Sequence, residues 1–199
     1  MEKVKMETVG YMVVYDLPNE DRVAFKYDAS ARGVVKRLRI NSIRKLGKYG
    51  LQCTESVLIV PRTLIDKMKK TIEEIRFTYR DAKEHLLKNY EEELEPEIYV
   101  IPLIGEQTEA LKTIAVKRLV DKLEKIIQRL LRLTVEIEEL EEDEKKKVRY
   151  NVKRVLRELE HTQDIIEELG IESVKLKEKF RLAEEVIREV LEEVMSERE

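Results

Sequence analysis

The chain has 199 residues, 41% of them charged, and the charges nearly cancel to a net of −3 at pH 7. This length allows one large domain or two small ones. The single cysteine, Cys53, excludes a disulfide within the chain, and we expect it to be a small buried apolar residue. No apolar run approaches the roughly 18 residues that span a bilayer, and the N-terminus lacks a signal-peptide core, so we expect a cytoplasmic protein with no membrane partner.

Abundant Lys, Glu and Arg with only four Asn and four Gln are typical of proteins from thermophiles. The charges are segregated along the chain. No acidic residue lies between Asp28 and Glu55, whereas the C-terminal half is acidic, with the run EELEEDE at 138–144. This segregation indicates either an anionic partner for the basic segment or a solvated basic helix face that an acidic tail balances.

Three β-branched runs bounded by Gly or Pro predict buried strands. Polar residues 19–31 separate the first run from the second and predict a loop or a short hairpin. The strands are expected over about 8–16, 51–60 and 96–103, the second of them bent.

A basic amphipathic helix is predicted over about 32–48, with Gly50 as the residue that ends it. Its spacing predicts one apolar side that faces the core. The residues expected to face inward are Val35, Leu38, Ile43 and Leu46.

From residue 63 onwards, apolar residues alternate in steps of four and three, which predicts helices with a narrow apolar seam. Breaks at Pro96, at the charged run 141–147 and at Gly170 separate four helices, and short connections make the last three antiparallel neighbours. The seams can form a core within one chain or pair with another chain, and spacing does not separate the two. The expected helices are 63–94, 107–141, 144–169 and 171–197.

Four fragments in order resemble the CRISPR-associated protein two family, the smallest subunit of the CRISPR spacer-acquisition complex. They are VVYDLP at 13–18, KYG at 48–50, ESVL at 55–58 and IYVIPL at 98–103. The resemblance covers roughly the first 105 residues and implies a ferredoxin-like domain that forms dimers. We therefore expect an α+β protein, with a ferredoxin-like domain over 1–105 and a helical bundle or coiled-coil extension over 106–199.

The chain departs from that family in three places. About fifteen extra residues, 19–33, follow the first strand, and the helix expected after residue 63 is about twice as long as the family's. The C-terminal half has no counterpart in the family. A relative that uses the same fold for another purpose remains an alternative.

Asp16 is the leading candidate for chemistry because a carboxylate at the end of a central strand can coordinate Mg²⁺ or Mn²⁺. The resemblance implies that this position cleaves phosphodiesters as one of two aspartates facing each other across a dimer axis. An Asx turn before Pro18 is the structural alternative. Glu20, Asp21 and Glu55 are the only nearby acidic residues in sequence, so a complete two-metal site is not supported.

The acid-free basic helix is the candidate nucleic-acid contact. Few aromatic residues interleave its cations, so duplex backbone contact fits better than stacking on a single strand. The candidate residues are Arg32, Lys36, Arg37, Arg39, Arg44, Lys45 and Lys48.

The other motifs give little evidence of a function. Glu158 and His161 have the E-x-x-H spacing of bundle di-metal sites, but the second such motif is missing, so His161 is expected to be an ordinary surface residue. The chain has no P-loop and no Rossmann glycine motif.

The sequence therefore predicts a dimeric scaffold that contacts DNA or RNA phosphates and recruits a protein partner through its helical extension. No cofactor is required in that function. The alternatives are a structural coiled-coil protein without a nucleic-acid role, and a nuclease that uses Asp16 with Mg²⁺ or Mn²⁺.

Overall fold

The computed structural model describes the whole chain except residues 1–9, 22–27, 91–93, 138–139 and 195–199. The chain divides into two compact units, Met1–Lys112 and Thr113–Glu199. The division falls a few residues after the domain boundary expected at 105/106.

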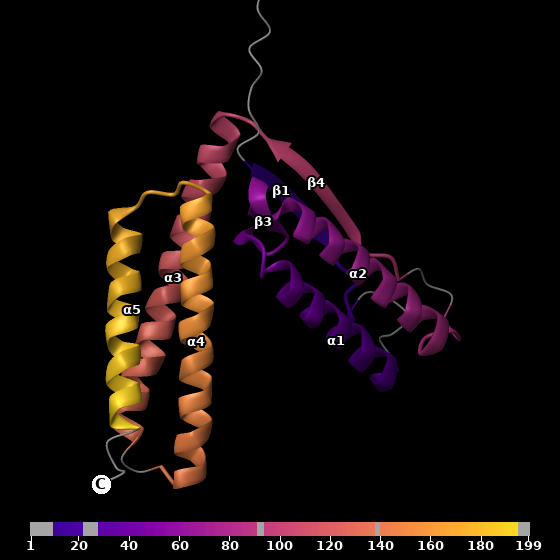
Figure 1. Ribbon diagram of the computed structural model, residues 1–199. Helices are drawn as coiled ribbons and strands as arrows, with labels where there is room; N and C mark the ends of the chain where they lie inside the picture. The colour runs from indigo at the N-terminus through magenta and orange to yellow at the C-terminus, as the bar shows by residue number, and fades with distance from the viewer. Residues whose placement is uncertain (1–9, 22–27, 91–93, 138–139, 195–199) are drawn as a thin grey trace, which may run out of the picture. The chain divides into compact units, whose positions relative to one another are not determined.

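Unit 1 contains a four-stranded antiparallel sheet, which makes the protein α+β (Figure 1). The region expected to be one bent strand is a hairpin of two strands. Its turn is stabilised by the backbone N–H of Ser56, which donates to Oγ1 of Thr54 at 3.3 Å. The strand order is β2-β3-β1-β4, and the strands are β1 (Gly10–Asp16), β2 (Leu51–Thr54), β3 (Val57–Pro61) and β4 (Glu97–Leu103).

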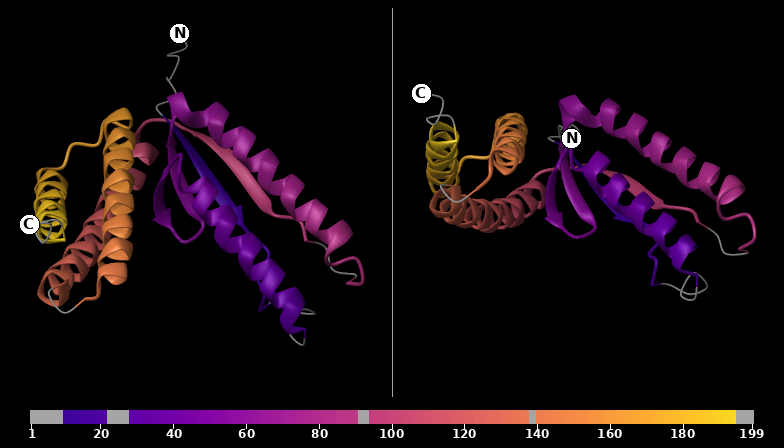
Figure 2. Two further views of the ribbon diagram at one scale, coloured as in Figure 1. Left: turned by 60° about the horizontal axis from the view of Figure 1, so that its bottom comes forward. Right: turned by 90° about the horizontal axis from the view of Figure 1, so that it is seen from below.

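Helices α1 (Ala29–Leu46) and α2 (Ile65–His85), the latter preceded by the short 3-10 helix η2 (Arg62–Leu64), run side by side (Figures 1 and 2). Their apolar residues share one core with every second residue of the central strands, so both helices cover the same sheet face. The predicted inward side of α1 is confirmed, because Val35 and Leu46 are buried and Leu38 and Ile43 are partly buried against the core. The core includes Val13, Tyr15, Val35, Leu46, Leu58, Val60, Met68, Ile72, Ile75, Tyr79 and Ile98.

Gly50 does not end α1. The helix ends at Leu46, and Gly47 caps it with a backbone N–H that donates to the carbonyl of Ile43. Gly50 is instead required by packing, because a Cβ atom there would lie 2.7 Å from the carbonyl oxygen of Ile59. The missing side chain lets the chain pass directly over β3 as it enters β2.

The second face of the sheet is apolar and partly exposed. Met12 and Val14 of β1 are half-buried there, and their cross-strand partners Ile101 and Tyr99 of β4 are 41% and 58% exposed. The second turn of α3 approaches the other end of this face, where Sγ of Cys53 lies 3.6 Å from a carbonyl oxygen of α3. Cys53 is buried, as predicted.

Unit 2 is a bundle of three helices (Figure 1). They are α3 (Glu106–Glu136), whose first turns belong to unit 1, α4 (Glu142–Glu168) and α5 (Val174–Glu193). Most residues of the predicted seams are buried, so these seams pack within one chain. The buried seam residues include Leu119, Leu123, Leu130, Val152, Leu159, Ile166, Leu176, Phe180, Ile187 and Val190.

Gly170 forms the predicted break between α4 and α5. Its φ of 59° suits glycine, its N–H donates to the carbonyl of Glu167, and the N–H of Ile171 donates to the carbonyl of Ile166. These two bonds form a Schellman motif, which reverses the chain tightly enough for α5 to pack back along α4.

Among the described residues, none of the helices is both long enough and apolar enough to cross a bilayer.

Candidate nucleic-acid interface

The seven candidate cations of α1 and its C-terminal turn fall into two groups by exposure. Lys36, Arg37, Arg44 and Lys48 are exposed, whereas Arg32, Arg39 and Lys45 are only half-exposed. The difference arises from the helix period, since the half-exposed residues flank the buried side of α1.

Each half-exposed cation has a carboxylate partner. Nη2 of Arg32 lies 3.0 Å from Oδ1 of Asp21, and Nη1 of Arg39 lies 3.8 Å from Oε2 of Glu20. Nζ of Lys45 lies 3.7 Å from Oε2 of Glu74 on α2. These partners come from the loop after β1 and from α2. The fold therefore neutralises part of the charge that appears uncompensated in the sequence.

The exposed cations form a stripe along α1. Arg37, Asn41 and Arg44 are spaced by four and three residues, so they lie on one side of the helix. Arg37 and Arg44 are separated by about 10 Å along the axis at 1.5 Å per residue. No carboxylate in the described part of the chain lies within ion-pair distance of Lys36, Arg37 or Arg44. We call Lys36, Arg37, Asn41 and Arg44 the α1 stripe.

The N-terminus of α1 is closed to an anion. Asp28 caps it and accepts hydrogen bonds from the backbone N–H groups of Ser30 and Ala31 at 2.8 and 3.0 Å. Asp28 also accepts a hydrogen bond from the hydroxyl of Tyr90, and this bond is the main reason that the pKa of Asp28 lies below its usual value. A phosphate at α1 is thus met by side chains and not by the helix dipole.

The α1 stripe belongs to a wider basic layer. Residues 29–90 contain 15 Lys and Arg against six Asp and Glu, and α1 and α2 lie on one side of the sheet. Phe77 of α2 is 67% exposed on this layer. An exposed aromatic ring next to cations can stack on an unpaired base. The expectation of few aromatic residues was limited to the basic segment around α1, so Phe77 of α2 was missed.

Asp16 is the exposed last residue of β1, and its cross-strand partner is Glu97, the first residue of β4. Both carboxylates lie on the sheet face away from α1 and α2. The sequence prediction named Glu20, Asp21 and Glu55 as the nearby acids and missed Glu97. Alternation along β4 places Glu97, Tyr99 and Ile101 on one face, but only the sheet order brings Glu97 to Asp16.

Among the described residues, no group of three or more His, Cys, Asp and Glu side chains is arranged to hold a metal ion. His161 is exposed on α4, as expected for a surface histidine.

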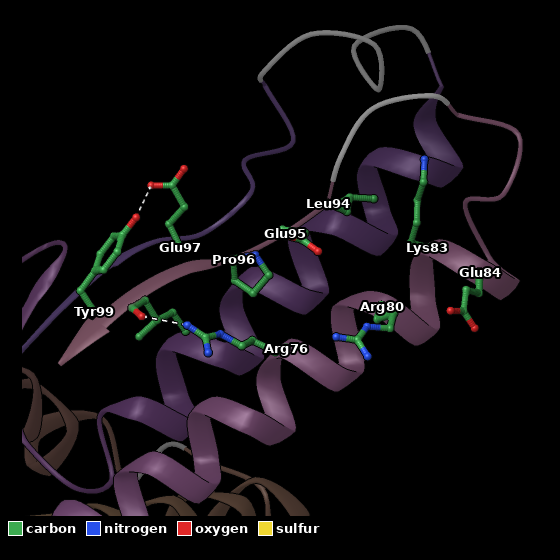
Figure 3. Close-up of a pocket in the computed structure, with 10 residues that line it drawn as sticks. Arg76, Arg80, Lys83, Glu84, Leu94, Glu95, Pro96, Glu97 and Tyr99 are labelled. Carbon is green, nitrogen blue, oxygen red and sulfur yellow. Dashed lines mark hydrogen bonds between the residues drawn. The ribbon is translucent and has the colours of Figure 1, made fainter.

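A hollow of about 790 Å³ lies between α2 and the outer edge of β4 (Figure 3). Arg76, Arg80 and Lys83 line one wall, and Glu95 and Glu97 line the other, so its charges are mixed. Arg76 donates through Nη2 to the carbonyl of Ile98 at 3.0 Å, and thereby occupies an outward-facing acceptor of β4.

Two prolines oppose the pairing of a further strand at the same edge of β4. Alternation from Ile98 makes Pro96 and Pro102 outward-facing as well, and neither has an N–H group to offer to another strand. Pairing of two sheets through the β4 edge is therefore disfavoured.

Unit 2 holds a second basic segment that the sequence prediction missed. Residues 145–157 on α4 contain seven Lys and Arg and no acidic residue. The net charge of the C-terminal half is negative, so these cations are not apparent when that half is considered as a whole.

In comparisons with protein-family models, curated proteins and solved structures, no family model, no curated protein and no solved structure matches this chain.

Proposed function

We propose that the protein binds the phosphate backbone of a nucleic acid through the α1 stripe and acts as a dimeric scaffold. The observation that carries this proposal is the exposure of Lys36, Arg37 and Arg44 on one acid-free helix face. Cations without carboxylate partners are free to displace the counterions of a nucleic acid, which is the main source of sequence-independent affinity.

The arrangement of unit 1 supports a ferredoxin-like assignment. The element order β1-α1-β2-β3-α2-β4 with the strand order β2-β3-β1-β4 is that of the split β-α-β motif. This agreement is also what supports the proposed relationship to the CRISPR-associated protein two family.

The apolar second sheet face favours the dimer. Met12, Val14, Tyr99 and Ile101 make a continuous cross-strand patch, while the β4 edge is closed by Pro96, Pro102 and Arg76. We propose that two copies pair face to face through this patch. Light scattering of the variant Tyr99→Glu/Ile101→Glu is expected to give a monomer near 23.6 kDa, while the unchanged protein gives twice that mass. A monomeric unchanged protein would contradict the dimer.

Nucleic-acid binding is tested by charge reversal. In the α1 variant, Lys36, Arg37 and Arg44 are replaced by Glu. In the control variant, Lys177, Arg181 and Arg188 of α5, which are also exposed, are replaced by Glu. Both variants change the net charge equally. We expect the α1 variant to lose at least about tenfold in affinity for a random-sequence duplex at about 100 mM salt, and the control variant to change less than about twofold.

Two results separate the alternative functions. No retention of duplex or single-stranded nucleic acid by the unchanged protein at about 50 mM salt would favour a structural or protein-interaction role. Cleavage that depends on Mg²⁺ or Mn²⁺ and is lost in Asp16→Ala would favour a nuclease. Within the described part of the chain, the pairing of Asp16 with Glu97 is what points to the nuclease.

A further inference from the structure

Helix α4 carries a basic surface of its own. Unit 2 as a whole is acidic, with 19 Lys and Arg against 23 Asp and Glu, but these acids lie at 136–144, from 158 onwards and at two positions of α3. Between them, residues 145–157 contain only basic and neutral side chains. Tyr150, at the middle of this segment, is 69% exposed.

Packing places one flank of α3 against α4 and the opposite flank against α5. Lys122 and Ile126 of α3 line one hollow together with Val155 and Glu158 of α4, so this flank of α3 borders α4. Oε1 of Glu124 lies 3.0 Å from Nζ of Lys179, so the opposite flank borders α5.

The helix period shows which other residues of α3 lie on the flank that borders α4. Arg129 is seven residues after Lys122 and lies on the same flank, with Lys125 and Arg132 next to it on the outer side. All of these cations are exposed. Of the two acids within this stretch of α3, Glu124 borders α5, whereas Asp121 is four residues before Lys125 and lies on the outer side.

On α4, Lys147 and Arg154 are seven residues apart and share the flank of Glu158, which borders α3. Tyr150 and Asn151 lie between them and are exposed. Because α3 and α4 run antiparallel, Arg129 and Arg132 lie near the level of the α4 turn that contains Tyr150. The cations of the two helices, together with Tyr150, thus form one surface, which we call the α3–α4 face. Its residues are Lys125, Arg129, Arg132, Lys147, Tyr150 and Arg154.

Few carboxylates neutralise this face. In the part of the chain that the structure describes, none lies within ion-pair distance of Lys125, Arg129, Arg132 or Lys147. Arg154 has a single partner, Glu158, at 3.9 Å on its own helix. Exposed pairs of this kind contribute little stability and exchange readily with another anion.

We infer that the α3–α4 face is a second binding surface for nucleic-acid phosphates, separate from the α1 stripe. Its cations supply the charge, while Asn151 can donate to a phosphate oxygen and Tyr150 can stack on a base or a sugar. An anionic membrane fits less well, because a membrane-bound helix inserts apolar anchors beside its cations. The exposed apolar residues of α3 at the level of this face, Leu131 and Val135, lie on the flank towards α5, and Ile114 lies near the start of the helix.

This inference rests on the proposed function only in naming the same class of partner, and it uses different residues. The unchanged protein is compared with three variants of equal charge change: Arg129→Glu/Lys147→Glu/Arg154→Glu, the α1 variant and the control variant on α5. Affinity for a labelled random-sequence duplex is measured from about 50 to about 200 mM salt. Circular dichroism confirms that each variant keeps its helices.

The α3–α4 variant is expected to lose at least about tenfold in affinity at about 100 mM salt and to flatten the salt dependence by about two to three charges. Binding equal to that of the control variant would overturn the inference. A loss in the α1 variant alone would leave the proposed function standing without the second surface. A loss in the α3–α4 variant alone would overturn the role of α1 and keep this inference.

Tyr150→Ala tests the neutral part of the face. It is expected to weaken binding of a single strand by at least about fivefold, and binding of a duplex by less, because stacking needs an unpaired base. Equal single-strand binding by Tyr150→Ala and the unchanged protein would remove Tyr150 from the surface. Binding to phosphatidylserine vesicles with no binding to nucleic acid would overturn the inference as a whole.

Discussion

Helix α1 of unit 1 lies within an acid-free segment with seven Lys and Arg, and helix α4 of unit 2 contains such a segment at 145–157. They differ in how the fold neutralises those charges. The partners of Arg32, Arg39 and Lys45 come from the loop after β1 and from α2. On α4, Lys146 and Arg154 instead pair with acids of the same helix three and four residues away, Asp143 and Glu158.

This difference shows that charge has to be assigned to helix faces and not to segments or halves of a chain. Ion pairs within one helix follow from i,i+3 and i,i+4 spacing and can be read from the sequence. Ion pairs between distant segments follow from the topology, and they decide which cations of α1 remain free.

The largest expected effect is on the core beneath α1. Ile75 of α2 is 1% exposed, so Ile75→Ala should destabilise unit 1 by about 2–5 kcal/mol through lost burial and a cavity. Ile187→Ala in unit 2, where the side chain is fully buried, is the matched change. We expect calorimetry to show that each variant lowers a different thermal transition. One common transition shifted equally by both would show that the two units do not unfold separately.

Substitutions at two glycines separate the effect of packing on stability from the effect of helix propensity. A Cβ on Gly50 would lie 2.7 Å from the carbonyl oxygen of Ile59, so Gly50→Ala should cost about 1–3 kcal/mol. A Cβ on Gly33, inside α1, meets nothing within 4 Å, so Gly33→Ala should stabilise by about 0.5–1 kcal/mol. Urea unfolding measures both. A stabilising Gly50→Ala would refute the close approach of the chain to β3.

Freeing a paired cation should strengthen binding. Glu74→Gln removes the partner of Lys45 and should raise duplex affinity about threefold by adding up to one phosphate contact. Glu73→Gln is the matched control, because it changes the net charge equally without releasing Lys45. Equal gains in both variants would indicate that only the overall charge matters, and would weaken the assignment of contacts to single cations.

The smallest effect concerns the pair between α3 and α5. Lys179 lowers the pKa of Glu124 below its ordinary value of 4.5, so the pair stabilises unit 2 above that pH and is lost as pH falls through the lowered pKa. Glu124→Gln should therefore be slightly less stable than the unchanged protein at pH 7, and equal to it in strong acid. Thermal unfolding from neutral to acidic pH measures this. A difference that grows on acidification would contradict the assignment.

The sequence was sufficient for features that depend on local spacing. The apolar side of α1, the apolar seams of the later helices and the break at Gly170 follow from helix periodicity and from glycine's tolerance of positive φ. The hairpin at 51–61 was missed, because no Gly, Pro, Asn or Asp marks its turn at Thr54–Ser56. The relation of Asp16 to Glu97 depends on the strand order, which strand composition does not specify.

The account depends most on the claim that unpaired exposed cations of α1 contact phosphates. Lysine acetylation with and without saturating duplex, followed by mass spectrometry, tests it residue by residue in the unchanged protein. The account predicts that duplex protects Lys36 strongly and leaves Lys177 of α5 as reactive as before, both lysines being exposed in the free protein. Undiminished reactivity of Lys36 at saturating duplex would contradict it.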